Sequence, residues 1–138
     1  MEKEQGSPVP IVLIVEDHAP ALAMVRLLLA KAFPGSRVEG VETAEQALEQ
    51  CASLSPHVVV MDISLPGMDG IEATRRLKVL LPDSRVVMHS SHEEQIYRDA
   101  ATLAGASAFV AKSQTFSDLV PAIAGLLPAI FGNGAGNG

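Results

Sequence analysis

The sequence has few of the residues on which several classes of protein depend. There is one cysteine among 138 residues, Cys51, so no disulfide can form within the chain, and a reducing compartment is expected. Tryptophan is absent and aromatic residues make up 4% of the chain, which leaves little surface on which nucleic-acid bases can stack. The 16 acidic and 10 basic residues give a net charge of −6, which disfavours direct binding to nucleic acid.

Long apolar runs and targeting segments are also missing. No stretch approaches the roughly 18 apolar residues of a membrane span, and residues 1–10 lack the apolar segment of a secretory signal. With 48% hydrophobic and 19% charged residues, the chain is too apolar for intrinsic disorder. We therefore expect one soluble, cytoplasmic domain over residues 10–131, with a flexible leader at 1–9 and a Gly/Asn-rich tail or linker at 132–138.

Short apolar runs alternate with helix-like segments along the whole chain. Strands are expected at 11–15, 37–41, 58–61, 85–90 and 109–111, because these runs are short and mostly β-branched. Helices are expected at 19–33, 43–51, 71–81, 93–103 and from 115 toward 130, the last one interrupted by Pro121 and Pro128. This alternation predicts an open α/β fold with a parallel sheet, helices on both faces and right-handed crossovers.

Polar side chains come directly after four of the predicted strands or at their last residue. Glu16 and Asp17 follow the first strand, Asp62 follows the third, Ser90 ends the fourth and Lys112 follows the fifth. Each signal is weak alone, since acidic turns and surface lysines are common. The carboxyl ends of parallel strands share one edge of the sheet, however, and ligands bind there in such folds. We therefore expect these five side chains to converge.

The convergence of these residue types predicts a magnesium-dependent phosphoryl-transfer site. Three carboxylates held close together resist ionisation, and a hard cation relieves them. Mg²⁺, or Mn²⁺ in its place, takes oxygen ligands of this kind beside phosphate oxygens. Lys112 and Ser90 would supply a positive charge and a hydroxyl to those oxygens. Asp62, central in the sheet, is the natural nucleophile for an acyl phosphate.

Four motifs resemble those of the receiver domain of two-component response regulators. They are Val-Glu-Asp-His at 15–18, Asp-Ile-Ser-Leu-Pro-Gly-Met-Asp-Gly at 62–70, Val-Met-His-Ser-Ser at 87–91 and Gly-Ala-Ser-Ala-Phe-Val-Ala-Lys at 105–112. The resemblance covers about residues 10 to 130. It implies a CheY-like, flavodoxin-like three-layer sandwich whose five parallel strands lie in the order 2-1-3-4-5. Two features are most like those in the receivers of NarL/LuxR-type transcriptional regulators. They are Asp17-His18 and Ser113, which stands where many receivers have proline.

The resemblance also implies roles for individual residues. Asp62 would accept a phosphoryl group from a phosphohistidine on a sensor histidine kinase or a histidine phosphotransfer protein. Asp17, Asp62 and the backbone carbonyl of Ser64 would bind Mg²⁺, with Glu16 acting directly or through water. Lys112 would pair with the phosphoryl group. Apart from this self-catalysed transfer and autodephosphorylation, no enzymatic activity is expected.

Two further residues would carry the switch. Ser90 would swing inward to hydrogen-bond the phosphoryl group, and Phe109 would follow from an outward to an inward rotamer, which changes the surface of helix 4, strand 5 and helix 5. In the family, the positions of Ser64 and His92 tune the lifetime of the aspartyl phosphate. DNA would be reached only through an output domain missing from this chain. A homodimer is a further possibility, although Pro121 disturbs the fifth helix on which such dimers pack.

The sequence leaves three alternatives to a receiver within a transcription factor: a stand-alone receiver, a phosphohydrolase and a degenerate receiver. The chain is either a piece of a transcription factor or a stand-alone receiver that acts by binding other proteins. A magnesium-dependent phosphohydrolase with an aspartate nucleophile would need an acid two residues after Asp62, where Ser64 stands. A degenerate receiver that serves only for protein contacts is disfavoured, since the set of five polar residues is complete.

Overall fold

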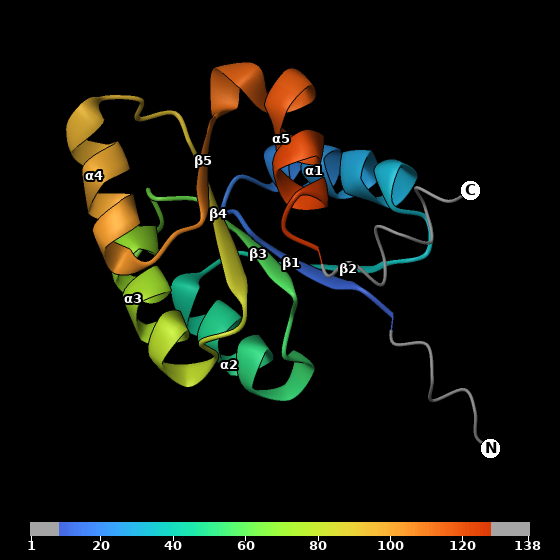
Figure 1. The fold of residues 1–138 in the computed structure, drawn as a ribbon, viewed down its shortest axis with the longest axis horizontal. Coiled ribbons are helices and arrows are strands. Elements are labelled where there is room, and N and C mark those ends of the chain that lie inside the picture. The colour runs from blue at the N-terminus through green and yellow to red at the C-terminus, as the bar shows by residue number, and fades with distance from the viewer. Residues whose placement is uncertain (1–8, 128–138) are drawn as a thin grey trace.

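Five strands form one parallel sheet at the centre of the molecule (Figure 1). The computed structural model describes residues 9–127. The strands are β1 (Ile11–Val15), β2 (Arg37–Val41), β3 (Val58–Met61), β4 (Arg85–Ser90) and β5 (Ala108–Ala111). They lie in the order β2-β1-β3-β4-β5, and every neighbouring pair is parallel. The predicted fold class and strand order are confirmed.

Helices cover both faces of this sheet. They are α1 (Ala19–Ala32), α2 (Ala44–Leu54), α3 (Gly70–Leu80), α4 (Gln95–Ala104) and α5 (Thr115–Ala124), and a short 3₁₀ turn, η1 (Lys112–Gln114), precedes α5. Figure 1 shows α1 and α5 on one face and α2, α3 and α4 on the other. The layers are therefore those of a three-layer sandwich, as predicted.

Two hydrophobic cores lie between the sheet and its helices. Successive residues of β1 point into different cores: Leu13 packs with Met61 and Leu77 on the α2–α4 side, whereas Ile14 packs on the α1/α5 side. The strands are apolar on both faces for this reason. Burial on both sides holds the carboxyl ends of β1 and β3 at fixed positions, and these ends carry the acidic residues.

Most of the helix boundaries follow local signals in the sequence. The Thr43 side chain accepts a hydrogen bond from the Gln46 N–H and so caps α2. In a capping box the Gln46 side chain would accept from the N–H of Thr43; here it accepts from the N–H of Glu42, one residue earlier. Asp69 caps α3 by accepting from the Glu72 N–H at 2.9 Å.

The end of α5 differs from the prediction. The helix continues through Pro121 but stops at Ala124, where a helix approaching residue 130 was expected. Gly125 follows, and the N–H groups of Leu126 and Leu127 both donate to the carbonyl of Ile123, which closes the last turn. Residues 128–130 of the expected helix, residues 1–8 of the leader and the whole tail at 132–138 lie outside the described residues. Within residues 9–127, no helix is long and apolar enough to cross a membrane.

Candidate functional site

Three carboxylates meet at the carboxyl edge of the sheet. Glu16 and Asp17 come directly after β1, Asp62 comes directly after β3, and one oxygen of each lies within 4.8 Å of the others. The sheet ladder continues into these residues, since the Asp62 N–H donates to the carbonyl of Val15 at 3.1 Å and the Glu16 N–H donates to that of Val41 at 3.0 Å. Backbone hydrogen bonds between neighbouring strands therefore place the carboxylates together.

Lys112 faces two of these carboxylates from the end of β5. Its Nζ lies 2.7 Å from Oε1 of Glu16 and 3.1 Å from Oδ2 of Asp62. The side chains of Glu16 and Asp62 are 3% and 6% exposed, so the ion pairs are largely shielded from water. The structure thus brings Glu16, Asp17, Asp62 and Lys112 together at one edge, as the positions of these residues along the chain indicate.

The charges at this site perturb one another. Burial raises the pKa of the Asp62 carboxyl, the nearby Glu16 carboxylate raises it further, and the opposing effect of Lys112 does not cancel the increase. Burial alone would lower the pKa of Lys112. Its contacts with Glu16 and Asp62 outweigh burial and raise that pKa. The site therefore favours a charged lysine and resists a second buried negative charge.

The residues fit a hard divalent cation. Within residues 9–127, Oε1 of Glu16 is the one buried side-chain oxygen or nitrogen without a hydrogen bond of good geometry, although Lys112 lies beside it. The Lys112 ammonium supplies a positive charge to this oxygen, and a buried carboxylate oxygen without a well-directed donor can accept a second cation. Asp17 is exposed, which leaves room for the water ligands that Mg²⁺ keeps. The Ser64 N–H donates to Oδ1 of Asp62 at 3.3 Å, and the role of the Ser64 carbonyl as a metal ligand stays a prediction.

Ser90 lies fully buried at the end of β4. Its hydroxyl oxygen accepts a hydrogen bond from the His92 N–H at 2.9 Å, so the side chain is engaged in the turn that follows the strand. The His92 ring in turn contacts Oγ of Ser64 through Nε2 at 2.9 Å and stacks on Tyr97 at 4.6 Å. These contacts link the loop after β3 with the loop after β4. The inward swing of Ser90 stays a prediction.

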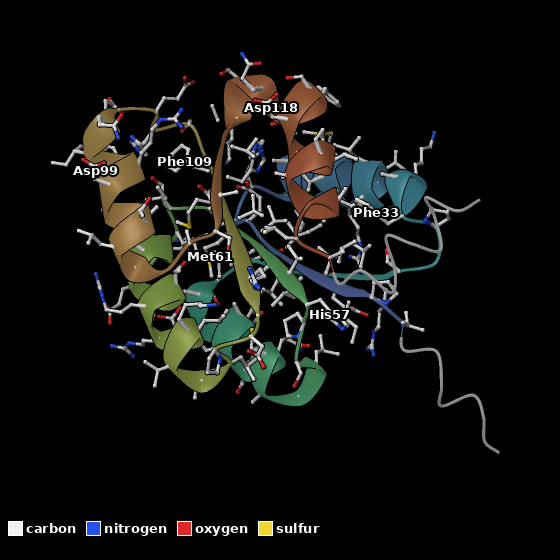
Figure 2. All side chains as sticks on the ribbon, viewed as in Figure 1. Phe33, His57, Met61, Asp99, Phe109 and Asp118 are labelled. Carbon is white, nitrogen blue, oxygen red and sulfur yellow. The ribbon has the colours of Figure 1, made fainter. Side chains whose placement is uncertain are left out.

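Phe109 lies between β5 and α4 (Figure 2). The ring is half-buried, and it packs against the core on the α2–α4 side. The guanidinium carbon of Arg98 lies 4.5 Å from the centre of the ring, in a cation–π contact. The Phe109 ring is therefore partly buried, with the Arg98 guanidinium from α4 against one face of it. Its change of rotamer stays a prediction.

Gly70, the first residue of α3, has a positional role that the sequence analysis missed. A Cβ built on Gly70 would lie 1.9 Å from the carbonyl oxygen of Asp62, and the Gly70 N–H donates to the carbonyl of Ile63 at 2.8 Å. Any side chain would push the β3–α3 loop away from Asp62. The sequence shows Gly70 only as the last residue of the motif at 62–70, because a close backbone approach leaves no mark in local sequence.

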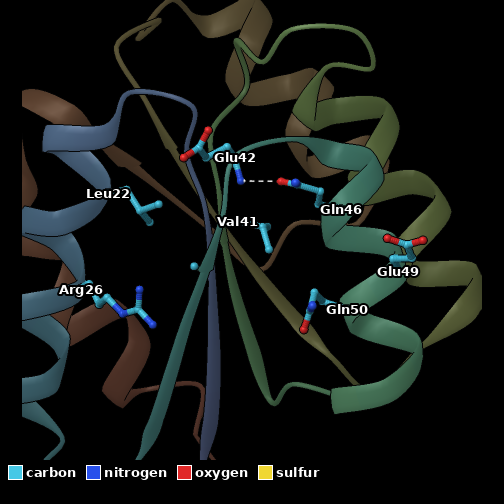
Figure 3. A pocket seen from close by; sticks show the side chains of 8 residues that line it. Leu22, Arg26, Val41, Glu42, Gln46, Glu49 and Gln50 are labelled. Atoms are coloured by element: carbon cyan, nitrogen blue, oxygen red, sulfur yellow. Dashed lines mark hydrogen bonds between the residues drawn. The ribbon is translucent and has the colours of Figure 1, made fainter.

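A separate open groove lies away from these residues. It has a volume of about 510 Å³ and lies over the outer edge of β2, between α1 and α2 (Figure 3). It is lined by Leu22, Arg26, Gly40, Val41, Glu42, Gln46, Glu49 and Gln50. No predicted site residue is among them, so this groove and the acidic site are separate.

Comparison with known proteins gives consistent results. The family model of the response regulator receiver domain matches residues 12–124. The response regulator GacA of Pseudomonas protegens is 35% identical over 113 residues, which are 81% of this chain and 53% of GacA. The transcriptional activator protein ExaE of Pseudomonas putida is 36% identical over 102 residues, which are 74% of this chain and 48% of ExaE.

A solved structure agrees with these relatives. The crystal structure of a two-component response regulator of the LuxR family from Aurantimonas has a TM-score of 0.78 at 32% identity, covering 84% of this chain and 83% of that one. The predicted likeness to LuxR-type receivers is confirmed. The chain spans about half the length of the two curated relatives. With the family model matched over most of its length, this chain belongs to the response regulator receiver domain family of two-component systems.

Proposed function

We propose that the chain is a phosphorylation switch in which Asp62 accepts a phosphoryl group from the phosphohistidine of a sensor histidine kinase or a histidine phosphotransfer protein. One observation carries this proposal: the Lys112 ammonium lies between two buried carboxylates, of which Asp62 is one. Buried carboxylates packed around a lysine at the ligand-binding edge of a sheet are the groups that phosphoryl transfer requires. The membership in the receiver family supports the same reaction.

The transfer is a simple displacement at phosphorus. An oxygen of Asp62 forms a bond to phosphorus while the P–N bond to the donor imidazole breaks, and the electron pair of that bond stays with the imidazole nitrogen. Glu16, Asp17 and Asp62 would hold Mg²⁺, or Mn²⁺, which when bound neutralises charge on the phosphoryl oxygens. Lys112 leaves its ion pair with Asp62 to contact an oxygen of the transferred group. Asp62 is the nucleophile in this reaction.

Phosphorylation would then change the surface on the far side of β4. Ser90 is proposed to leave its hydrogen bond with His92 and donate its hydroxyl to the phosphoryl group. Phe109 would move into the space beneath it and release its contact with Arg98. The surface formed by α4, β5 and α5 would change as a result. Hydrolysis of the acyl phosphate by water resets the switch, and no external substrate is converted.

The output of the switch is proposed to be control of transcription. The name of ExaE, a transcriptional activator, and the LuxR-family neighbour support a DNA-binding output domain beyond this receiver, in the cytoplasm. A receiver that acts by itself through protein contacts, or as a homodimer, is the alternative. An aspartate-dependent phosphohydrolase is not favoured, because the residue two positions after Asp62 is Ser64, whose hydroxyl contacts His92.

Labelling with a small phosphodonor tests the assignment of Asp62. The protein is incubated with acetyl phosphate and Mg²⁺, and its mass is followed. We expect the wild type to gain one phosphoryl group and Asp62→Asn to gain none, because an amide cannot form the acyl phosphate. Asp69→Asn is the matched control: Asp69 caps α3, and asparagine caps helices equally well. Labelling of Asp62→Asn would assign the phosphoacceptor to another residue.

Beryllofluoride tests the conformational part of the proposal. It mimics an acyl phosphate on a carboxylate, and its binding can be followed by NMR of the backbone amides. We expect shifts at Asp62 and Lys112 that spread to Ser90 and Phe109. Shifts confined to the neighbourhood of Asp62 would contradict the proposed change of the surface formed by α4, β5 and α5.

A further inference from the structure

His89, the residue before Ser90 in β4, is a buried imidazole that the proposed reaction does not use. It is 4% exposed. Its register partner in β5 is Val110, and both Val110 and Val87 belong to the apolar core on the α1/α5 side. A polar ring at a strand position with apolar neighbours is costly unless its nitrogens find partners. The structure supplies one partner, the hydroxyl of Thr115.

A chain of two hydrogen bonds joins His89 to the backbone of Lys112. Nε2 of His89 lies 2.8 Å from Oγ1 of Thr115, and that hydroxyl donates to the carbonyl oxygen of Lys112 at 2.8 Å. A carbonyl oxygen only accepts, and we assign the threonine hydrogen to that of Lys112. Oγ1 must then accept from His89, and Nε2 must carry the hydrogen. The direction of the chain is therefore His89 to Thr115 to Lys112.

These two hydrogen bonds end on the turn that carries Lys112. Lys112 begins η1 directly after β5, and the Thr115 N–H donates to the same Lys112 carbonyl. A lysine side chain has a flexible stem of four methylene groups. Its ammonium stays between two carboxylates only if the backbone from which the side chain starts is held in place. His89 reaches this turn from β4, the strand adjacent to β5, across 26 residues of sequence.

We propose that His89 is a positioning residue for Lys112, which it acts on through Thr115. The inference rests on the proposed function, since it assigns to His89 the orientation of the lysine that contacts the phosphoryl group. Without the hydrogen bond from Nε2, the turn at 112–114 loses a side-chain link to β4 that adds to the backbone pairing of β4 with β5, and the Lys112 ammonium spends less time between Glu16 and Asp62.

The charge state of the ring is consistent with this role. Burial, together with the positive charge of Lys112, holds the pKa of His89 at about 4, so the imidazole is neutral at neutral pH. A neutral ring with hydrogen on Nε2 donates to Thr115 without repelling the lysine. The negative charge of Glu16 has the opposite effect on the pKa of His89, but it does not outweigh burial.

Three substitutions test the proposal. His89→Leu and Thr115→Val each break the chain while keeping the side-chain volume similar, and His89→Gln keeps an N–H donor near the position of Nε2. We expect the first two to slow labelling by acetyl phosphate about tenfold, the size expected for one lost positioning hydrogen bond. We expect His89→Gln to restore most of the rate and Mg²⁺ affinity to stay unchanged in all three. Val87→Ala, on the same strand and face, is the control for general loss of stability, and its labelling rate should stay that of the wild type.

A double-mutant cycle separates positioning from a merely structural role. If His89 acts through Lys112, then His89→Leu has no further effect on labelling in a Lys112→Met background. A full tenfold loss in that background would overturn the proposal, as would wild-type labelling by His89→Leu.

A measurement without phosphorylation distinguishes failure of this inference from failure of the proposed function. In ¹⁵N-labelled protein, the side-chain ammonium of Lys112, assigned with Lys112→Met, should give a resolved signal protected from exchange with water. That signal should broaden in His89→Leu and return in His89→Gln. If the wild type is not labelled but the ammonium signal behaves in this way, the proposed function fails and the positioning role stands. An identical signal in His89→Leu would refute the positioning role whatever the labelling shows.

Discussion

Replacing Lys112 with methionine is the most informative perturbation of the site. Methionine keeps much of the length and apolar stem of lysine but removes the positive charge between Glu16 and Asp62. The two carboxylates, 3% and 6% exposed, then face each other without a cation. We expect a large loss of stability that depends on pH and on Mg²⁺, because both a proton and a metal ion can replace the lost charge.

The size of the loss follows from the distances. At 2.7 and 3.1 Å, the two ion pairs are worth about 6 and about 5 kcal/mol before desolvation, with an effective dielectric constant of about 20. Desolvation of the lysine offsets much of this, and breaking a buried pair by removing one partner typically costs about 3–5 kcal/mol. Protonation sets an upper limit: raising a carboxyl pKa from about 4 to 7 corresponds to about 4 kcal/mol, beyond which the group binds a proton. The expected loss at pH 7 is therefore about 3–4 kcal/mol.

Urea unfolding with and without Mg²⁺ measures this loss. Lys31→Met, at an exposed lysine in the last turn of α1, is the matched control and should change stability little. Mg²⁺ should bind Lys112→Met more tightly than the wild type, because no ammonium competes with it for the carboxylates, and at a concentration about 100 times the dissociation constant it adds about 2.7 kcal/mol. Stabilisation by Mg²⁺ should therefore be larger in the variant.

The pH dependence has a definite sign. The pKa of Asp62 is already raised in the folded wild type, so its ionisation opposes folding, and stability falls as the pH rises from the ordinary carboxyl range through the raised value. Without Lys112 that pKa rises further, and the variant should regain stability as the pH is lowered from 7 toward about 5. A loss below about 1 kcal/mol at pH 7, or a variant that no longer binds Mg²⁺, would refute the reasoning.

The remaining predictions concern the loops around the site. Gly70→Ala should destabilise the protein by about 1–3 kcal/mol in urea unfolding and slow phosphorylation, because its Cβ would meet the Asp62 carbonyl at 1.9 Å. Gly35→Ala, whose Cβ meets nothing within 4 Å, is the control, and equal effects of the two would show that the contact is unimportant. Arg98→Met should cost less than about 1 kcal/mol, the value of an exposed cation–π contact, and should change the aromatic NMR signals of Phe109. Unchanged Phe109 signals would contradict a restraining role for Arg98.

Local patterns in the sequence predict much of this fold. The runs Ile11–Val15 and Val58–Met61 are apolar at every position because both faces of the sheet are covered, and this is visible without a structure. The cap residues Thr43 and Asp69 act on N–H groups three residues away, so local sequence records them too. The end of α5 was placed too late, because the apolar composition around Pro121 continues beyond the turn that closes the helix.

The sequence predicts which residues form the candidate site but not the distances between them. The position of Asp62 directly after a buried strand, and of Glu16 and Asp17 after another, places them at one edge in any parallel sheet. The strand order that makes β1 and β3 neighbours came from the motifs that this chain has in common with receivers, since periodicity alone is compatible with several orders. With that order, the meeting of the three carboxylates follows.

By itself, the sequence determined which segments are strands and helices and which polar residues stand at strand ends, because burial and capping act over a few residues along the chain. Tertiary structure alone decided that Lys112 lies 3.1 Å from a carboxylate 50 residues away, that a buried oxygen of Glu16 lies 2.7 Å from the same ammonium, and that His89 reaches Thr115. These contacts join residues from different strands and helices. Their distances depend on how the two cores pack on the sheet, and no local pattern carries that information.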